Sequence, residues 1–158
     1  MSEEIAGSEA APEAKLLNAE PATRAVAFGI DFLVALVLSL VPGVGGLLAA
    51  GYWLVRDGLD FEFMDRRSIG KRILRIRPVT LDGSPVNLDV SARRNWMFAL
   101  FGIGRFLMQI TILGSLGVLI VAGVGLVLTA VEGWLVFTDP DGRRLGDGIA
   151  NTRVVEET

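Results

Sequence analysis

Two long stretches of the chain are nearly free of charged side chains. Between residues 25 and 55 the only charge is Asp31, and between residues 95 and 138 the only charges are Arg105 and Glu132. All other charged residues lie in segments 1–24, 56–94 and 139–158. A soluble core interleaves its charges at helical or strand period, whereas a bilayer excludes charge from whole segments. The pattern therefore predicts a protein that crosses a membrane several times.

The two apolar stretches divide into four expected helices. Residues 42–46 and 114–117 contain glycine and carry no charge, which is typical of tight turns. A helix that crosses the membrane needs about 20 residues, since these cover roughly 30 Å at a rise of 1.5 Å per residue. We therefore expect four transmembrane spans, at residues 22–41, 44–59, 96–113 and 116–137.

Small residues recur at helical spacing on two of these spans. They are Gly46, Ala50 and Gly51 on the second span, and Gly125, Thr129 and Gly133 on the fourth. Such residues allow two helix backbones to approach closely inside a membrane. We expect them to form packing faces.

The first 21 residues differ from the rest of the chain. They carry five glutamates against one lysine, with alanine, serine and proline between them. This composition does not bury a core. We expect residues 1–21 to be a disordered acidic tail and residues 22–155 to form the folded membrane domain.

The two other polar segments are expected to form a small β element. The loop 60–94 contains a predicted hairpin over residues 75–86, with its turn near Asp82. The C-terminal segment 139–155 ends in a predicted strand at residues 152–155, which could join that hairpin.

The distribution of positive charge sets the expected topology. Of the fifteen Lys and Arg residues all except Arg105 lie in or beside the N-terminal tail, the loop 60–94 and the C-terminal segment. The positive-inside rule then places both termini and this loop in the cytoplasm. The fold class predicted is an all-α membrane protein with four transmembrane helices and a small cytoplasmic β-hairpin or strand element.

Charged residues inside expected spans need partners, because an isolated charge at that depth is costly. Asp31 and Arg105 each lie about nine residues from the cytoplasmic start of their spans, roughly 13 Å deep as helices. Matched depth predicts an Asp31–Arg105 ion pair. For Glu132 the first expected partner is Arg24 and the second is Arg56.

Two interpretations of these intramembrane charges remain open. In one, the charges pair with each other and fix how the helices pack. In the other, Asp31 alternates between Arg105 and a transported proton or cation. The balance of two anions against two cations favours the first, and the usual role of intramembrane charge favours the second.

The composition narrows the chemistry that the chain can perform. It contains no cysteine and no histidine, so thiol chemistry, cysteine or histidine metal sites and histidine proton transfer are excluded. No pairing of nucleophile and base is apparent along the sequence. We expect no catalytic residue, no metal site, no cofactor and no enzymatic activity.

A basic stretch follows the second expected span. Arg66, Arg67, Lys71 and Arg72 are interleaved with apolar residues, and such clusters beside a membrane bind anionic lipid headgroups. We expect membrane lipids as partners and no nucleic acid. The simpler reading is that these are ordinary positive-inside residues.

Three short motifs, taken in order, resemble the RDD family of bacterial membrane proteins. Arg24, Ala27 and Asp31 are similar to its opening signature, residues 68–72 (SIGKR) to its central loop, and residues 145–155 (LGDGIANTRVV) to its closing segment. The resemblance identifies Arg24, Asp31 and Asp147 as the signature positions. One departure is Gly146, which stands where the family often has histidine.

The resemblance implies a multi-pass protein of the bacterial cytoplasmic (inner) membrane. Transport of unidentified ligands, with cation/proton exchange in some members, has been suggested for the family. We expect Asp147 at the cytoplasmic surface, accepting hydrogen bonds from Arg24 or Lys71. The leading functional hypothesis is a small, oligomeric, ion-coupled transporter centred on Asp31 and Arg105. The alternative is a non-transporting scaffold that binds lipid or another membrane protein.

Overall fold

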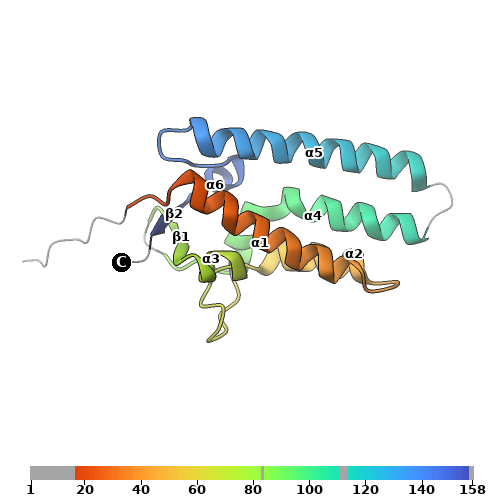
Figure 1. Cartoon of the computed structure of the whole chain (residues 1–158), viewed down its shortest axis with the longest axis horizontal. Coiled ribbons are helices and arrows are strands. Elements are labelled where there is room, and N and C mark those ends of the chain that lie inside the picture. Colours follow the sequence, from red (N-terminus) through yellow and green to blue (C-terminus); the bar gives the residue numbers. More distant parts are fainter. Residues whose placement is uncertain (1–16, 83, 111–113, 157–158) are drawn as a thin grey trace, which may run out of the picture.

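The computed structural model describes residues 17–82, 84–110 and 114–156. Four main helices lie side by side and are joined into a bundle (Figure 1): α1 (Pro21–Ser39), α2 (Gly45–Val55), α4 (Leu88–Ile110) and α5 (Gly114–Thr138). The smaller elements gather at the end where α1 begins: α3 (Ile69–Ile73), β1 (Ile76–Thr80), α6 (Leu145–Ile149) and β2 (Thr152–Glu156). We call this end of the molecule the cap.

The mostly helical fold is confirmed, but the four predicted crossings are only partly supported. Among the described helices, Pro21–Ser39 and the part of α5 at Leu119–Thr138 are long and apolar enough to cross a membrane. The α2 helix has 11 residues, roughly 16 Å at 1.5 Å per residue, or about half the hydrocarbon thickness. The α4 helix begins at Leu88 and not at Trp96, so its first turns carry charged residues.

Close packing of small residues joins α2 to α4. A Cβ atom on Gly46 would lie 2.5 Å from the carbonyl oxygen of Gly102, and one on Gly102 would lie 2.5 Å from the Ala50 nitrogen. The predicted packing face of Gly46 and Ala50 is therefore confirmed. Beside it the rings of Trp53 and Phe98 are 5.0 Å apart at their centroids, within a buried apolar cluster.

The small sheet has a different pairing from the one expected. β1 pairs with β2 in antiparallel register, with Ile76 opposite Glu156 and Thr80 opposite Thr152. The predicted strand at residues 152–155 is thus confirmed, but the predicted hairpin over residues 75–86 is wrong. After β1 the Leu81 amide donates to the Asn151 carbonyl, so the chain extends the ladder with β2 before it turns into α4.

Residues 17–20, which precede the predicted domain boundary, contact the sheet. Asn18 forms a β-bridge with Val155, and the Ala19 amide donates to the Val154 carbonyl at 2.9 Å. Residues 17–20 therefore cover the outer edge of β2, and Ala19 is buried against the sheet. The remainder of the predicted acidic tail, residues 1–16, lies outside the described residues.

The chain repeats one order of elements twice: two main helices, a short helix and a strand. Residues 67–80 (RSIGKRILRIRPVT) and 143–156 (RRLGDGIANTRVVE) align without a gap. Matching positions include Gly70 with Gly146, and Arg75 with Asn151. Both residues of the second pair have a left-handed backbone, with φ of 54° and 50°.

The register of the sheet follows the same symmetry. Pro78 lies opposite Val154, which is its own equivalent in the second half. The pair Ile76–Glu156 likewise exchanges with the pair Thr80–Thr152. An approximate two-fold axis therefore passes through the centre of the sheet and relates α3–β1 to α6–β2.

Candidate functional site

Charged side chains are buried together where the cap meets the main helices. Among the described residues, four carboxylates and six cations are each at most 9% exposed: Asp31, Asp57, Glu132 and Asp147, with Arg24, Arg56, Arg67, Lys71, Arg94 and Arg144. Arg67 pairs with Asp65 at the surface. The other nine residues are called the buried charge network.

Asp31 of α1 is held by partners from two other elements. Its Oδ2 accepts from Arg56 Nη1 at 2.7 Å, and its Oδ1 accepts from the Tyr52 hydroxyl at 2.7 Å and the Gly70 amide at 2.9 Å. Arg56 also donates to Asn95 and lies over the Trp53 ring, with its guanidinium carbon 4.2 Å from the ring centroid. One carboxylate thus joins α1, α2 and α3.

The predicted Asp31–Arg105 pair is wrong. Arg105 is exposed on α4, whereas Asp31 is 1% exposed and bound to Arg56. Similar depth along two helices does not place two side chains on facing sides. Arg56 reaches Asp31 because α2 runs back toward the cap beside α1 (Figure 1), so that Arg56, just past the end of α2, lies beside the middle of α1.

Asp57 lies at the centre of a second group. It accepts from Lys71 Nζ at 2.6 Å and from Asn95 Nδ2 at 3.0 Å, and its Oδ2 is 3.4 Å from Arg94 Nε. Burial alone would raise the pKa of Asp57, but Lys71, Arg94 and Arg56 hold the pKa well below its usual value. Burial lowers the pKa of Lys71 to about 7, against the opposing effect of Asp57.

Asp147 links the start of α1 to the cap. Arg24 Nη2 donates to its Oδ2 at 2.7 Å, Arg94 Nη2 lies 3.0 Å from its Oδ1, and the Arg144 amide donates to it at 3.2 Å. Its predicted bond with Arg24 is confirmed, whereas Lys71 pairs with Asp57. Although burial alone would raise the pKa of Asp147, Arg94, Arg144 and Arg24 hold it well below its usual value. The side chain is fully buried and not at a surface.

Glu132 on α5 has different partners from those predicted. Its Oε1 accepts from the Gly146 amide at 2.8 Å, and its Oε2 lies 3.4 Å from Arg144 Nε. Arg24, the predicted first partner, donates instead to Asp147 and to the Gly142 carbonyl. Arg56, the second choice, pairs with Asp31. After α5 the chain turns back along the bundle, and this turn places Arg144 and Gly146 beside Glu132.

Two glycines of the cap make the network possible. A Cβ on Gly70 would lie 2.1 Å from the Ala27 carbonyl oxygen, and one on Gly146 would lie 2.1 Å from the Arg94 carbonyl oxygen. Only glycine allows α3 and α6 to approach the main helices this closely. The approach aims the Gly70 amide at Asp31 and the Gly146 amide at Glu132.

Several central residues were not predicted as site residues: Asp57, Arg94, Asn95 and Arg144. For α4 a signal existed. Ser91, Arg94, Asn95 and Phe98 follow the helical spacing of one face and are all buried. The span expected from the sequence begins at Trp96, after the last charged residue, and this places Ser91 and Arg94 in the loop 60–94.

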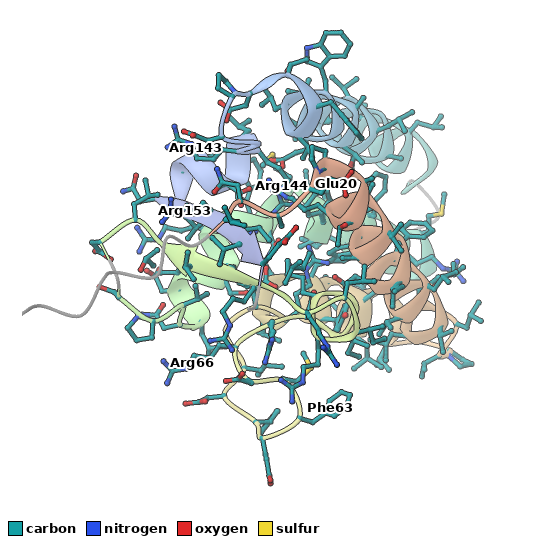
Figure 2. The ribbon with its side chains drawn as sticks, turned by 60° about the vertical axis from the view of Figure 1, so that its left-hand side comes forward. Glu20, Phe63, Arg66, Arg143, Arg144 and Arg153 are labelled. Atoms are coloured by element: carbon teal, nitrogen blue, oxygen red, sulfur yellow. The ribbon has the colours of Figure 1, made fainter. Side chains whose placement is uncertain are left out.

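The basic stretch divides into buried and surface residues. Lys71 and Arg67 are buried, so they do not present their charge to a headgroup as predicted. The side chains of Arg66 and Arg72 are 38% and 40% exposed, and they pair with Asp60 and Asp65 respectively. Figure 2 shows Arg66 and Phe63 on a loop that projects from the bundle, away from Arg144.

A cavity of about 170 Å³ adjoins the network between α1 and α5. Its walls are mainly apolar, and five cations of the network contribute to its lining: Arg24, Arg56, Lys71, Arg94 and Arg144. Over the described part of the chain no group of three acidic residues could hold a metal ion.

The helices α1 and α5 expose many apolar side chains, whereas the charged residues gather at the cap end of the bundle. This distribution is consistent with a membrane protein. The family model that matches this chain is that of the RDD family, over residues 44–151. This is more than half of the chain, and the protein belongs to the RDD family. The matched residues include Asp147 but not Arg24 or Asp31. No curated protein and no solved structure matches the chain.

Proposed function

We propose that this RDD protein is a non-transporting, non-enzymatic membrane scaffold whose buried charges fix its structure and whose surface binds lipid or a membrane partner. One observation carries the proposal. Each of the four buried carboxylates is engaged by a cation and by at least one other hydrogen-bond donor. The charge of a carboxylate held in this way is compensated by its partners, whose removal destabilises the fold, and the carboxylate does not offer an open site for an ion.

The position of the network supports the same proposal. Beyond Asp31, toward the far end of the bundle, the interior contains a cluster of apolar residues that includes Ala35, Ala49 and Trp53. A transport path needs polar groups or water along its whole length. Within the described residues the buried charges gather at the cap end only.

The orientation proposed is with the cap in the cytoplasm of a bacterium and the bundle in its inner membrane. The turn at the opposite end over residues 40–44 contains no charged residue, and neither does the sequence between α4 and α5. The cap and its loops contain nearly all of the lysines and arginines, which favours the cytoplasmic side for both termini.

A projecting loop of the cap has the chemistry of a membrane surface contact. Phe61 and Phe63 are each 64% exposed, and the partly exposed side chains of Arg66 and Arg72 lie nearby in sequence. Aromatic rings and arginines together favour the headgroup region of a bilayer. This loop and the exposed faces of α1 and α5 are also the surfaces on which a second copy or a membrane-protein partner would bind.

Ion-coupled transport is the second candidate, and Lys71 is the observation that favours it. Its pKa of about 7 means that it exchanges a proton near neutral pH, in direct contact with Asp57. In this alternative the Lys71–Asp57 pair, and not Asp31 with Arg105, would be the coupling site.

Flux through reconstituted liposomes tests the proposal. Wild type, Asp31→Asn and Lys71→Met are each given proton and Na⁺ gradients. We expect no flux above that of protein-free vesicles in any of them. Flux in the wild type that Lys71→Met abolishes and Asp31→Asn retains would establish the second candidate. Flux that Asp31→Asn abolishes would make the Asp31 centre a coupling site.

A further inference from the structure

The two-fold repeat is broken at one helix pair. The repeat relates α1 to α4 and α2 to α5, so the contact of α2 with α4 corresponds to a contact of α5 with α1. The α2–α4 contact is the most extensive between any two elements, whereas α1 and α5 touch at few positions. Figure 1 shows α5 lying along α4, while α1 and α2 lie together on the other side of α4.

The small residues of α2 and α5 reflect this difference. On α2 the small residues Gly46 and Ala50 lie directly against the α4 backbone. On α5 a Cβ on Gly125 would touch the Phe101 ring of α4 at 3.2 Å, but one on Gly133 would meet no atom within 4 Å. The predicted packing face on α5 is therefore used at Gly125 and left open at Gly133.

The cavity described above occupies this open position. Its walls are formed by α1 and α5 and its base by Arg94 and Phe98 of α4. Phe28, Val136 and Phe137 provide apolar surface, and Gly133 is part of the lining. The cleft thus separates the two helices that are long and apolar enough to cross a membrane.

The charges at the inner end of the cleft favour an anion. The lining contains five cations but only two carboxylates, Asp31 and Glu132. With Asp57 and Asp147 behind them, the network has five basic residues against four carboxylates, and it carries an excess of one positive charge among the described residues while Lys71, whose pKa is about 7, is protonated. An uncompensated buried charge is costly unless a ligand supplies its partner.

Five polar atoms of the cleft lining have no hydrogen-bond partner among the described residues, and three of them, Arg94 Nε and Nη2 and Glu132 Oε2, lie instead in ion pairs. The other two are donors that, within the same residues, also lack an ion pair. The Nε–H of Arg56 and the hydroxyl of Thr129 are buried and have no hydrogen-bond partner among the described residues. Both residues line the cleft. Buried donors are normally satisfied, and both could donate to an oxygen of a bound anion.

We propose that the cleft between α1 and α5 binds one anionic phospholipid, with its phosphate at the inner end beside the Nε–H of Arg56 and the hydroxyl of Thr129 and an acyl chain between the two helices. The proposal rests on the membrane location proposed above. A ligand that enters between two membrane-crossing helices comes from the bilayer. A soluble anion would not require the apolar walls, and a helix from a second copy would not supply the negative charge.

Native mass spectrometry of the detergent-solubilised protein tests this site. The protein is mixed with phosphatidylglycerol, which is anionic, or with phosphatidylcholine, which is zwitterionic. Gly133→Phe fills the cleft, and Gly123→Phe on the same helix is the matched control because a Cβ there also meets no atom within 4 Å. Replacing glycine inside a helix favours the helix in both variants, so both should fold.

The wild type and Gly123→Phe are expected to retain one phosphatidylglycerol and little phosphatidylcholine. In Gly133→Phe the dissociation constant for phosphatidylglycerol is expected to rise about tenfold, because the phenyl ring occupies space that the lipid needs. Equal retention of the two lipids, or equal retention by the two variants, would overturn the proposal. A dimer that Gly133→Phe alone disrupts would assign the cleft to a second copy instead. These outcomes are independent of the flux experiment. Failure of the lipid-site proposal can therefore be distinguished from failure of the proposed scaffold function.

Discussion

Arg24 and Asp147 form a buried ion pair of 2.7 Å between residues that are 123 positions apart. Arg24 lies near the start of α1, and Asp147 lies in the short helix that follows α5. The pair joins the first and last parts of the fold. It also shows how the network works: each carboxylate of the network holds a segment of the cap against a main helix.

Removing one partner of this pair leaves a buried charge without compensation. Arg24→Met and Asp147→Asn should each lower the free energy of unfolding by about 3–5 kcal/mol. The double variant should lose less free energy of unfolding than the sum of the two single losses. With both residues replaced, neither one remains as a buried charge that lacks its partner. Thermal unfolding in detergent, followed by circular dichroism, measures all three. Strictly additive losses would show that the two residues do not act as a pair.

The glycines of the cap provide a second test. Gly70→Ala and Gly146→Ala place a methyl group 2.1 Å from a carbonyl oxygen of α1 or α4. Each should destabilise the fold by about 1–3 kcal/mol or more, since the short helix must move away from its carboxylate. Gly148→Ala in α6 is the matched control, because a Cβ there meets no atom within 4 Å.

Unfolding midpoints of the three variants decide the result. The control should match the wild type or exceed it slightly, because alanine favours a helix more than glycine does. Equal midpoints for Gly146→Ala and Gly148→Ala would contradict a close contact between α6 and α4.

Acid should destabilise the cap. The pKa values of Asp57 and Asp147 in the fold lie well below the values of the unfolded chain. Their ionised forms therefore contribute stability that is present above about pH 4 and is lost as the pH falls below it. An unfolding midpoint that stays constant from pH 6 to pH 3 would contradict this assignment.

Lys71 should change the stability of the fold at neutral to alkaline pH. Its pKa falls from 10.5 to about 7 in the fold, where it faces Asp57, Arg56, Arg94 and Asp31. Between these two pKa values Lys71 binds a proton in the unfolded chain more often than in the folded protein. The contribution of Lys71 to the free energy of unfolding therefore rises with pH. Stability measured from pH 7 to pH 9 should increase in the wild type and change less in Lys71→Met. An equal slope in both proteins would assign the effect to another group.

The sequence predicted which segments are apolar better than it predicted which side chains meet. The first expected span, residues 22–41, closely matches α1, and the strand at residues 152–155 lies within β2. Both follow from local composition. The strand at residues 152–155 was expected to join the β element of the loop 60–94, and it pairs with β1. The hairpin expected within residues 75–86 was wrong, because closeness in sequence does not by itself make the adjacent segment the partner of β1.

The ion pairs show the limit more clearly. Depth along a helix follows from residue number, but the side on which a charge lies depends on the direction of every neighbouring helix. Arg105 has the depth of Asp31 and is exposed, whereas Arg56, the second expected partner of Glu132, is buried and bound to Asp31. Asp147 and Arg24 were linked correctly because the resemblance to the family singled out both positions.

The central claim is that Asp31 is a structural residue held by Arg56, and a double-mutant cycle tests it most directly. Unfolding free energies are measured for Asp31→Asn, Arg56→Gln and Arg105→Gln and for the two double variants that contain Asp31→Asn. We expect a coupling energy of about 1–3 kcal/mol between Asp31 and Arg56 and none beyond about 0.5 kcal/mol between Asp31 and Arg105. Coupling of Asp31 to Arg105 and not to Arg56 would contradict the account.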